Sequence, residues 1–591
     1  MTLLKSIALV SLFLAAAGCA CAQSQSIVVT GAAVPIPLAE ADRDVTVLPL
    51  APNERPLFDS WFELLQLDPA LDLRQRAPGG FIADLSIRGA TFGQTLVLLN
   101  GLRLNDSQTG HFNLDLPVPL DMVSGMEVMK GSGSTLYGSD AIGGVVNVIT
   151  HPRETPSLRL LTGIGNFGTN QEHLIGAFGG PAISEEVAVA RDFSSGFAPD
   201  RDYRNLALSS LTSLHPAWGA TSLLLAYSDR PYGADQFYGP YPSWERTKTW
   251  FASLHQNLGD HTEASFAFRR HTDLFVLFRD HPQIYTNRHV LDSWQGDLRR
   301  HDDLPGHAVI SYGVEGLADS ITSTNLGMRS RTRGSGYVFY DVRALHRFGL
   351  SAGLREEVYG SRQVATSPSL SGTAWLSSRF KLRASASRAF RLPSYTDLYY
   401  SDPANRGNPN LKPESATSYE AGVDGYVRAN LRGSLTVFQR RSTDGIDYVR
   451  ANSTAVWQAT NFDRLHFTGV EAAAVYEPVA SQHFSASFAA LRGVTGTAIL
   501  QSKYAFNYAA HSGVLEWRGT FRNMLIARTR IGVVDLVGRG PYAVWDVSGA
   551  RATGRVRPFL QLRNLGGTVY QEIPSVRMPG RGILGGFEFV L

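Results

Sequence analysis

Beyond residue 22 the sequence contains no cysteine, because Cys19 and Cys21 are the only two in its 591 residues. Disulfides, thiolate nucleophiles and cysteine metal sites are therefore not expected in the rest of the chain. The same part has no run of about 18 apolar residues, the length that a membrane-spanning helix needs. It also has no nucleophile elbow and no His-Glu-x-x-His motif, so the chain is not expected to be an enzyme.

Charge is scarce as well. Only 18% of the residues are charged and the formal net charge is +3, which leaves no basic stripe for nucleic acid. Glycine, in contrast, is abundant, with 57 residues spread along the chain, and 10% of the residues are aromatic. This composition favours many short strands joined by turns, so any crossing of a membrane must be made by strands.

The first 22 residues have the pattern of a secretory signal peptide. Lys5 precedes an apolar core at residues 7–17, and the small-residue site Ala20-Cys21-Ala22 stands before Gln23. Residues 16–19 (Ala-Ala-Gly-Cys) offer an alternative, since they are similar to a lipoprotein box that lacks its leading Leu. The mature chain is therefore predicted to begin near Gln23.

Three zones follow. Residues 23–52 combine a β-branched run with Pro35, Pro37 and Pro49, which predicts a flexible arm. Residues 53–152 mix a helical pattern at 58–67 with apolar strands at 95–99 and 145–149, which predicts a compact α/β unit. Residues 153–591 form the third zone.

The third zone alternates apolar and small or polar residues. Phe266 and Phe268 alternate with Ser265 and Ala267, and residues 484–489 follow the same pattern. Alternation of this kind is typical of a transmembrane barrel with a lipid face and a lumenal face. At about 20 residues for each strand and loop, the zone has room for roughly 22 strands. A soluble sandwich is the disfavoured alternative.

Several segments of the second and third zones are highly specific in order and spacing. They are Leu85-Ser86-Ile87-Arg88-Gly89, residues 96–105 (LVLLNGLRLN), residues 127–131 (EVMKG), residues 134–150 with Leu136-Tyr137-Gly138-Ser139-Asp140-Ala141-Ile142-Gly143-Gly144, residues 390–393 (FRLP) and residues 407–414 (GNPNLKPE). With these landmarks the chain resembles the TonB-dependent outer-membrane receptors, and among them it is most similar to the cobalamin (vitamin B12) receptors.

The resemblance implies a transmembrane β-barrel of about 22 antiparallel strands in the cell outer membrane, closed by an N-terminal α/β plug domain. The domains are then the signal peptide (residues 1–22), the arm with a TonB box (23–52), the plug (53–152) and the barrel (153–591). Two features depart from the family. Ser124-Gly125 stands where an acidic and then a basic or amide residue is usual, so polar contacts between plug and barrel are not expected there, and the chain ends in Leu591 rather than Phe.

Residues Ser26, Ile27, Val28, Val29 and Thr30 resemble the family's TonB box. An exposed β-branched segment near a flexible terminus can add a strand to the sheet edge of another protein. The resemblance names that partner as the periplasmic end of TonB, which supplies the energy for uphill transport.

Two plug loops are expected to meet the ligand first. Amide, hydroxyl and aromatic groups dominate them, and the predicted substrate-binding residues are Thr91, Phe92, Gln94, Gln108, His111 and Asn113. Such groups suit a corrinoid with its amide rim, although solvent-facing loops share this composition without a ligand. A ferric siderophore is the alternative cargo, because the landmarks are common to receptors for many ligands.

No cofactor is required for such transport, but calcium is an expected ion. Five aspartates are predicted to lie on neighbouring extracellular loops, where crowded carboxylates favour Ca²⁺; they are Asp192, Asp200, Asp202, Asp229 and Asp235. Cobalamin receptors order their loops with a similar aspartate spacing, and solvated loop acids are the alternative.

The expected function is thus TonB-dependent uptake of a scarce nutrient, most similar to corrinoid uptake. Outer-membrane lipids and, as an open possibility, a surface lipoprotein are its further partners. A passive pore or an adhesin is disfavoured because neither needs a plug. Haem is disfavoured as cargo because no histidine lies between Phe390 and Asn408, where haem receptors that resemble this pattern usually carry one.

Overall fold

The computed structural model describes residues 27–591 except residues 152, 154, 346, 361, 496–500 and 523. The predicted signal peptide (residues 1–22) and Ser26 lie outside the described residues.

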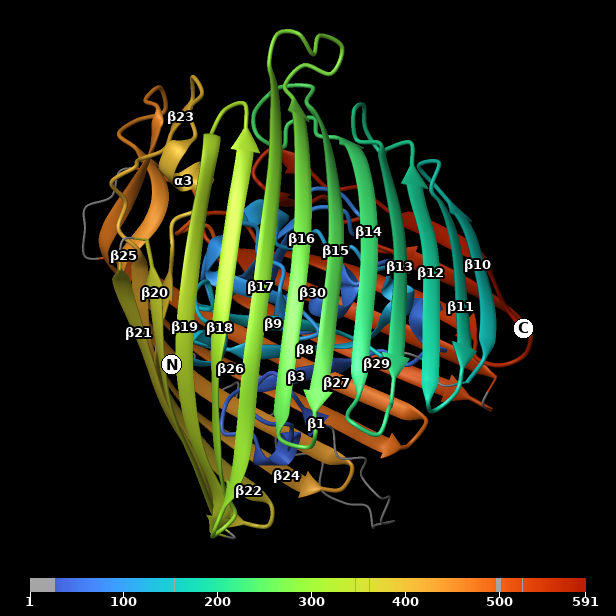
Figure 1. The fold of residues 1–591 in the computed structure, drawn as a ribbon. Helices are drawn as coiled ribbons and strands as arrows, with labels where there is room; N and C mark the ends of the chain where they lie inside the picture. The colour runs from blue at the N-terminus through green and yellow to red at the C-terminus, as the bar shows by residue number, and fades with distance from the viewer. Residues whose placement is uncertain are drawn as a thin grey trace, which may run out of the picture.

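A closed antiparallel barrel of 22 strands makes up most of the chain and confirms the predicted fold class (Figure 1). Its first strand pairs with its last, with Arg159 opposite Val590, so the sheet keeps no open edge. The barrel strands are β10 (Ser157–Gly165), β11 (Asn170–Gly179), β12 (Ile183–Ser194), β13 (Tyr203–Leu214), β14 (Thr221–Gly233), β15 (Trp244–Leu258), β16 (Thr262–Val276), β17 (Thr286–Leu304), β18 (Ala308–Ser323), β19 (Gly327–Leu345), β20 (Phe348–Tyr359), β21 (Gln363–Ser377), β22 (Phe380–Arg391), β24 (Glu414–Arg428), β25 (Leu431–Arg450), β26 (Trp457–Val479), β27 (Gln482–Thr495), β29 (Ala509–Phe521), β30 (Leu525–Leu536), β31 (Tyr542–Arg551), β32 (Val556–Arg563) and β35 (Gly582–Val590).

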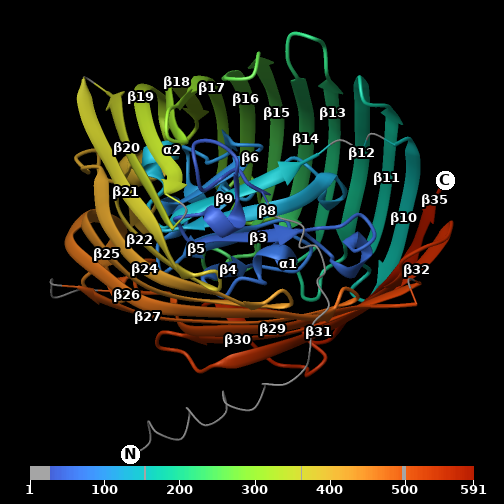
Figure 2. The same ribbon diagram turned by 90° about the horizontal axis from the view of Figure 1, so that it is seen from below.

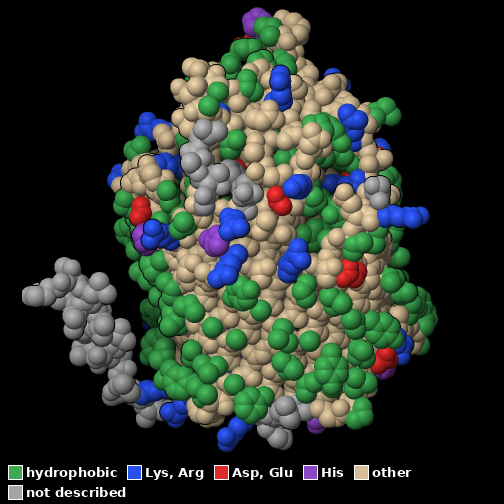
Figure 3. Space-filling model, turned by 90° about the vertical axis from the view of Figure 1, so that its left-hand side faces the viewer, with side chains coloured by type: hydrophobic (Ala, Val, Ile, Leu, Met, Phe, Trp, Pro, Cys, Tyr) green, Lys and Arg blue, Asp and Glu red, His purple; other side chains and the backbone are tan. Residues whose placement is uncertain are grey.

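The outer surface of the barrel carries the apolar side chains that the alternation predicts. Phe266, Phe484 and Phe488 are exposed, whereas Ala267 and Ala489, each next to one of these phenylalanines, are buried. Figure 3 shows hydrophobic side chains gathered over the lower half of the visible face, with lysine and arginine more frequent above. This apolar band is the surface that lipid covers.

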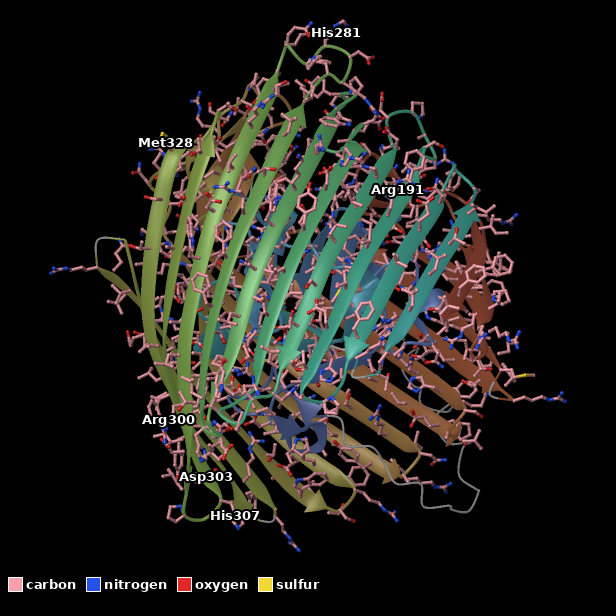
Figure 4. All side chains as sticks on the ribbon, turned by 45° about the vertical axis from the view of Figure 1, so that its right-hand side comes forward. Arg191, His281, Arg300, Asp303, His307 and Met328 are labelled. Carbon is pink, nitrogen blue, oxygen red and sulfur yellow. The ribbon has the colours of Figure 1, made fainter. Side chains whose placement is uncertain are left out.

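The two ends of the barrel differ in loop length. Connections at one end span two to six residues, whereas the other end carries long loops such as residues 392–413. His281 lies at the tip of a long loop, and Arg300, Asp303 and His307 lie at the opposite rim (Figure 4). Short turns face the periplasm and long loops face outward in such barrels, so the long-loop end is extracellular.

The long loops contain short elements of their own. These are the helix α3 (Tyr395–Tyr399) and the strands β23 (Asn405–Arg406), β28 (Gln501–Ser502), β33 (Gln571–Ile573) and β34 (Val576–Arg577).

The plug lies inside the barrel, surrounded by its wall (Figure 2). Its core is a five-stranded sheet in the order β3-β8-β9-β6-β7, beside a β4–β5 hairpin. Its strands are β1 (Ile27–Val28), β2 (Ile36–Pro37), β3 (Val45–Pro49), β4 (Leu71–Gln75), β5 (Ala83–Ile87), β6 (Thr95–Leu99), β7 (Leu102–Arg103), β8 (Val123–Lys130) and β9 (Gly144–Thr150), and its helices are α1 (Phe62–Leu65), α2 (Ser134–Tyr137) and the 3-10 turns η1 (Leu38–Glu40), η2 (Arg55–Leu57), η3 (Phe92–Gln94), η4 (Gly110–Phe112) and η5 (Leu120–Met122). In the described part of the chain, no helix is long and apolar enough to cross a membrane.

Two local expectations are wrong. The helix expected over residues 58–67 is only the single turn α1, because the backbone is extended at Phe58 and the chain turns again at Asp68-Pro69. Residues 45–49, expected in the flexible arm, form β3 and pair with β8 along the edge of the plug sheet. The reason is that β8 would otherwise leave its outer edge unpaired inside the barrel.

Candidate functional site

An aromatic cluster lies at the extracellular end of the plug. Phe92 of η3 stacks on His111 of η4 with their ring centroids 4.2 Å apart. Tyr504, from the loop before β29, meets Phe92 edge-on at 5.0 Å, and Tyr238, from the β14–β15 loop, lies 6.4 Å from His111. Two plug turns and two barrel loops thus build one aromatic surface, which we call the apex cluster (Phe92, His111, Tyr238 and Tyr504).

His111 is held in a fixed orientation. Its Nδ1 lies 2.7 Å from a carboxylate oxygen of Asp84, and Asp84 is in turn paired with Arg76 at 3.1 Å. Asp84 and Arg76 are buried, so the ring cannot turn away without losing a hydrogen bond to a buried carboxylate. The apex cluster is therefore a rigid surface suited to stacking against a flat ligand.

The predicted ligand residues fall into two groups. Gln94, Gln108 and Asn113 are buried, and their side chains bind inside the protein: Gln94 donates to Glu414 (2.7 Å) and Gln108 to Asp273 (2.9 Å). The Asn113 side-chain oxygen accepts from the backbone N–H of Asp106 at 3.0 Å. These three fix the loops, whereas Thr91, Phe92 and His111 keep part of their surface exposed.

A cation also lies beside the apex cluster. Lys503 Nζ is 5.4 Å from the ring of Tyr504, 5.6 Å from Tyr448 and 5.9 Å from Trp457. Burial lowers the pKa of Lys503. Sequence patterns do not predict this arrangement, because Tyr448 of β25, Trp457 of β26 and the loop that holds Lys503 and Tyr504 are brought together only by the barrel.

Residues 27–30 are docked on the plug, which corrects the expectation that they are exposed. Val28 pairs with Ile36 and is fully buried, as is Thr30, while Val29 is 41% exposed. Burying the side chain of a valine contributes roughly 1.5–3 kcal/mol, which favours docking over exposure to water.

The carboxylate of Glu127 holds this segment in place. It accepts hydrogen bonds from the backbone N–H groups of Val29 (3.0 Å) and Thr30 (2.7 Å). Asn147 donates to the Thr30 hydroxyl (3.1 Å), and the Tyr137 hydroxyl donates to the Thr30 carbonyl oxygen (3.1 Å). Strand addition to another protein would therefore first require the release of these contacts.

The five aspartates predicted to bind calcium are paired with basic or amide side chains, and only Asp200 and Asp202 share one partner. Asp192 pairs with His173 at 3.0 Å in the barrel wall, and Asp229 pairs with Arg246 and Arg204 at 2.7 and 3.2 Å. Asp200 and Asp202 share Arg279, at 3.0 and 2.9 Å, and Asp235 accepts from the Gln236 side chain at 3.1 Å. Over the described residues no three His, Cys, Asp or Glu side chains are grouped so that they could hold a metal ion. Calcium stays a prediction.

Ion pairs join the plug to the barrel wall. The buried guanidinium of Arg88 contacts Glu471 (2.6 Å) and Glu420 (2.5 Å) of the barrel and Asp44 (3.0 Å) of the plug. Ser124 takes no part, since its hydroxyl donates to the Ile149 carbonyl oxygen within the plug. A connected set of buried charges thus fixes the plug inside the barrel.

Comparison with known proteins agrees with this architecture. Residues 185–568 match the family model "TonB dependent receptor-like, beta-barrel" and residues 37–145 match "TonB-dependent Receptor Plug Domain". The chain is 26% identical to a vitamin B12 transporter of Photobacterium profundum over 69% of this chain and 70% of that protein. It is also 26% identical to an iron-regulated outer membrane virulence protein of Vibrio cholerae, over 63% of this chain and 62% of the other.

Solved structures share the fold at lower identity. The siderophore receptor PirA of Acinetobacter baumannii superposes with a TM-score of 0.76 at 13% identity, covering 94% of this chain and 99% of the other. The copper transporter OprC gives a TM-score of 0.77 at 14% identity, covering 93% and 98%.

Proposed function

Because the chain belongs to the TonB-dependent receptor family and is an outer-membrane transporter, we propose that its cargo is a corrinoid. The apex cluster carries this proposal. It offers ring faces and ring edges to a large ligand. The side chains of Thr91 and His111, which are partly exposed, provide polar groups at the same surface. Relatives named as vitamin B12 transporters support the same choice.

The energy for uptake enters at residues 27–30 in this proposal. TonB takes this segment from its place on Glu127 and adds it to its own sheet, so a force on the plug's N-terminus follows. The buried ion pairs of Arg88 keep the plug seated until that force acts.

A ferric siderophore is the second candidate. Lys503 and its three neighbouring aromatic rings favour it, since a cation among aromatic side chains suits an anionic, aromatic iron chelate. The iron-regulated relative of Vibrio cholerae points in the same direction.

Equilibrium binding distinguishes the two. Purified protein is titrated with cyanocobalamin and with a small panel of ferric catecholate and hydroxamate chelates. We expect saturable binding of cyanocobalamin and none of the chelates; the reverse result excludes the corrinoid.

Variants of the apex cluster tie the binding to the site. A pair of interacting rings contributes about 0.5–1.5 kcal/mol, so Phe92→Ala should weaken binding roughly 2- to 10-fold. Tyr241→Ala is the matched control, because Tyr241 is a loop aromatic that contacts Phe278. Equal affinities of the two variants would place the ligand elsewhere.

A further inference from the structure

Two cavities flank the plug on one side of the barrel. The upper cavity, of about 160 Å³, lies between plug residues such as Leu71 and Gln75 and the aromatic side chains of Tyr203, Tyr542 and Tyr570. The lower cavity, of about 1100 Å³, lies between β3 and the wall formed by β25, β26, β27 and β29, toward the periplasmic turns. It is as large as a pocket for a sizeable ligand.

One strand and one turn are common to both cavities. The strand β29 contributes Ser512 to the upper cavity and Arg518 to the lower one, so the two lie along the same strip of wall. Asp68 and Pro69, in the turn between α1 and β4, line both. This turn, residues 67–70, therefore separates the two spaces, and we call it the gate turn.

Several contacts fasten the gate turn, among them a hydrogen bond from the backbone N–H of Arg88 to the Ala70 carbonyl oxygen at 3.1 Å. Ser512 of β29 donates to the Pro69 carbonyl oxygen at 2.6 Å, which ties the turn to the wall. On the plug side, Lys130 pairs with Asp68 at 3.0 Å, and the Thr46 hydroxyl donates to Asp68 at 2.8 Å. Thr46 belongs to β3, the edge strand of the plug sheet and its first strand after residues 27–30. Displacement of β3 would thus remove one of the contacts that hold the gate turn.

Part of the wall below the gate turn is made of small side chains. Ser434, Ala473, Ser485 and Ser487 line the lower cavity, together with charged residues such as Glu471, Glu516 and Arg518, in contrast to the large aromatic groups above. A path for a moving ligand must bind it weakly enough to let it go, and small side chains offer no deep anchor.

We propose that the cargo passes along β29 between the plug and the barrel wall, through the upper and lower cavities, and that the gate turn is the constriction that β3 releases when the N-terminus is pulled. This inference rests on the transport function and adds the route and its gate. Most of the plug, including the apex and α2, stays seated while the gate turn moves.

Filling the lower cavity tests the route. Ser434→Trp places an indole in it, whereas Leu435→Trp, one residue on, places the same group on the lipid face, where Leu435 is 50% exposed. Initial rates of cyanocobalamin uptake by cells are compared at equal amounts of folded receptor. We expect at least a tenfold loss for Ser434→Trp with unchanged cargo affinity, and less than a twofold change for Leu435→Trp.

Ser487→Trp on the neighbouring strand gives the same test if Ser434→Trp does not fold. Normal uptake by a folded cavity-filling variant would overturn the route. If the cargo is not a corrinoid, the unsubstituted receptor does not take up cyanocobalamin either. A wrong cargo is thereby distinguished from a wrong route, for which the unsubstituted receptor and the folded cavity-filling variant both take it up.

Reversible cross-links test the gate. Pro69→Cys with Ser512→Cys joins the gate turn to the wall, and Ser132→Cys with Ser418→Cys joins the plug to β24 where the two hydroxyl oxygens lie 2.9 Å apart. Removal of the predicted signal peptide leaves no native cysteine to interfere. A short thiol cross-linker closes either pair if a direct disulfide does not form.

With the gate pair closed we expect cargo binding without uptake, and recovery on reduction; with the control pair closed, uptake continues. Uptake by the closed gate pair would contradict the gate. A block by both pairs would mean that the whole plug must move, which would also overturn the proposal.

Discussion

The docking of residues 27–30 on Glu127 predicts that this carboxylate restrains the access of TonB to its receptor. The change to make is Glu127→Gln, which keeps the shape and removes the charge. Two backbone N–H groups, of Val29 and Thr30, donate to the carboxylate at 3.0 and 2.7 Å. Glu127 is 2% exposed, so the bond from Thr30 is buried and the bond from Val29 is partly buried.

The magnitude follows from the difference between charged and neutral acceptors. A hydrogen bond to a charged group contributes about 1.5–3 kcal/mol and one to a neutral group about 0.5–1.5 kcal/mol. In Glu127→Gln, both hydrogen bonds go to a neutral acceptor instead of a charged one, so the docking of residues 27–30 loses roughly 1–3 kcal/mol of free energy. If most molecules hold the segment docked, the apparent affinity for TonB rises by about 5- to 150-fold, because less free energy goes into release.

The assay is a titration of the purified receptor with the periplasmic domain of TonB, followed by fluorescence anisotropy of a label on TonB. Glu40→Gln is the control, since Glu40 is an exposed plug acid outside these contacts. Asn147→Ala should have a smaller effect, because it removes one neutral bond to the Thr30 hydroxyl. An affinity of Glu127→Gln equal to that of Glu40→Gln would refute the idea that the carboxylate restrains the segment.

Three further outcomes are expected. Val28→Pro should abolish uptake while cargo binding stays normal, because proline removes a donor needed for strand addition; uptake at the normal rate would exclude residues 27–30 as the TonB box. If Asp200 and Asp202 bind calcium after release from Arg279, a chelator should lower cargo affinity, and an affinity unchanged by chelator would rule the site out. The extracellular hairpin β33–β34 should detach from the plug as pH rises, because burial, with Asp72 nearby, raises the pKa of Glu572 to about 8. The docked hairpin favours the protonated carboxyl, so the free energy of docking is most favourable below about pH 4.5, weakens as pH rises toward 8, and is constant above. Hydrogen exchange of residues 571–577 measures this dependence, and Glu572→Gln should remove it. A dependence that persists in the variant would assign it to another group.

The sequence alone determined the class of machine. A period of two residues repeated over more than 400 residues fits only a long series of strands, and a closed sheet is the only such arrangement that satisfies its backbone in lipid. The plug was equally accessible, because landmarks such as residues 136–144 lie close together in the chain. The N-terminal boundary of the plug was harder to predict. The strand β3 belongs to the plug because the edge of β8 needs a hydrogen-bonding partner, and the residue pattern at 45–49 does not indicate that pairing.

What only the tertiary structure decided are the contacts between segments far apart in the chain. Phe92 and Tyr504 meet because a plug turn and a barrel loop converge, and Glu127 meets Thr30 because the N-terminus folds back on the plug sheet. The aspartates show the converse. All five were expected to meet, but only Asp200 and Asp202 do, at Arg279, whereas Asp192 and Asp229 pair with other basic side chains. Charge pairing depends on distances of a few ångströms, which spacing along the chain does not fix.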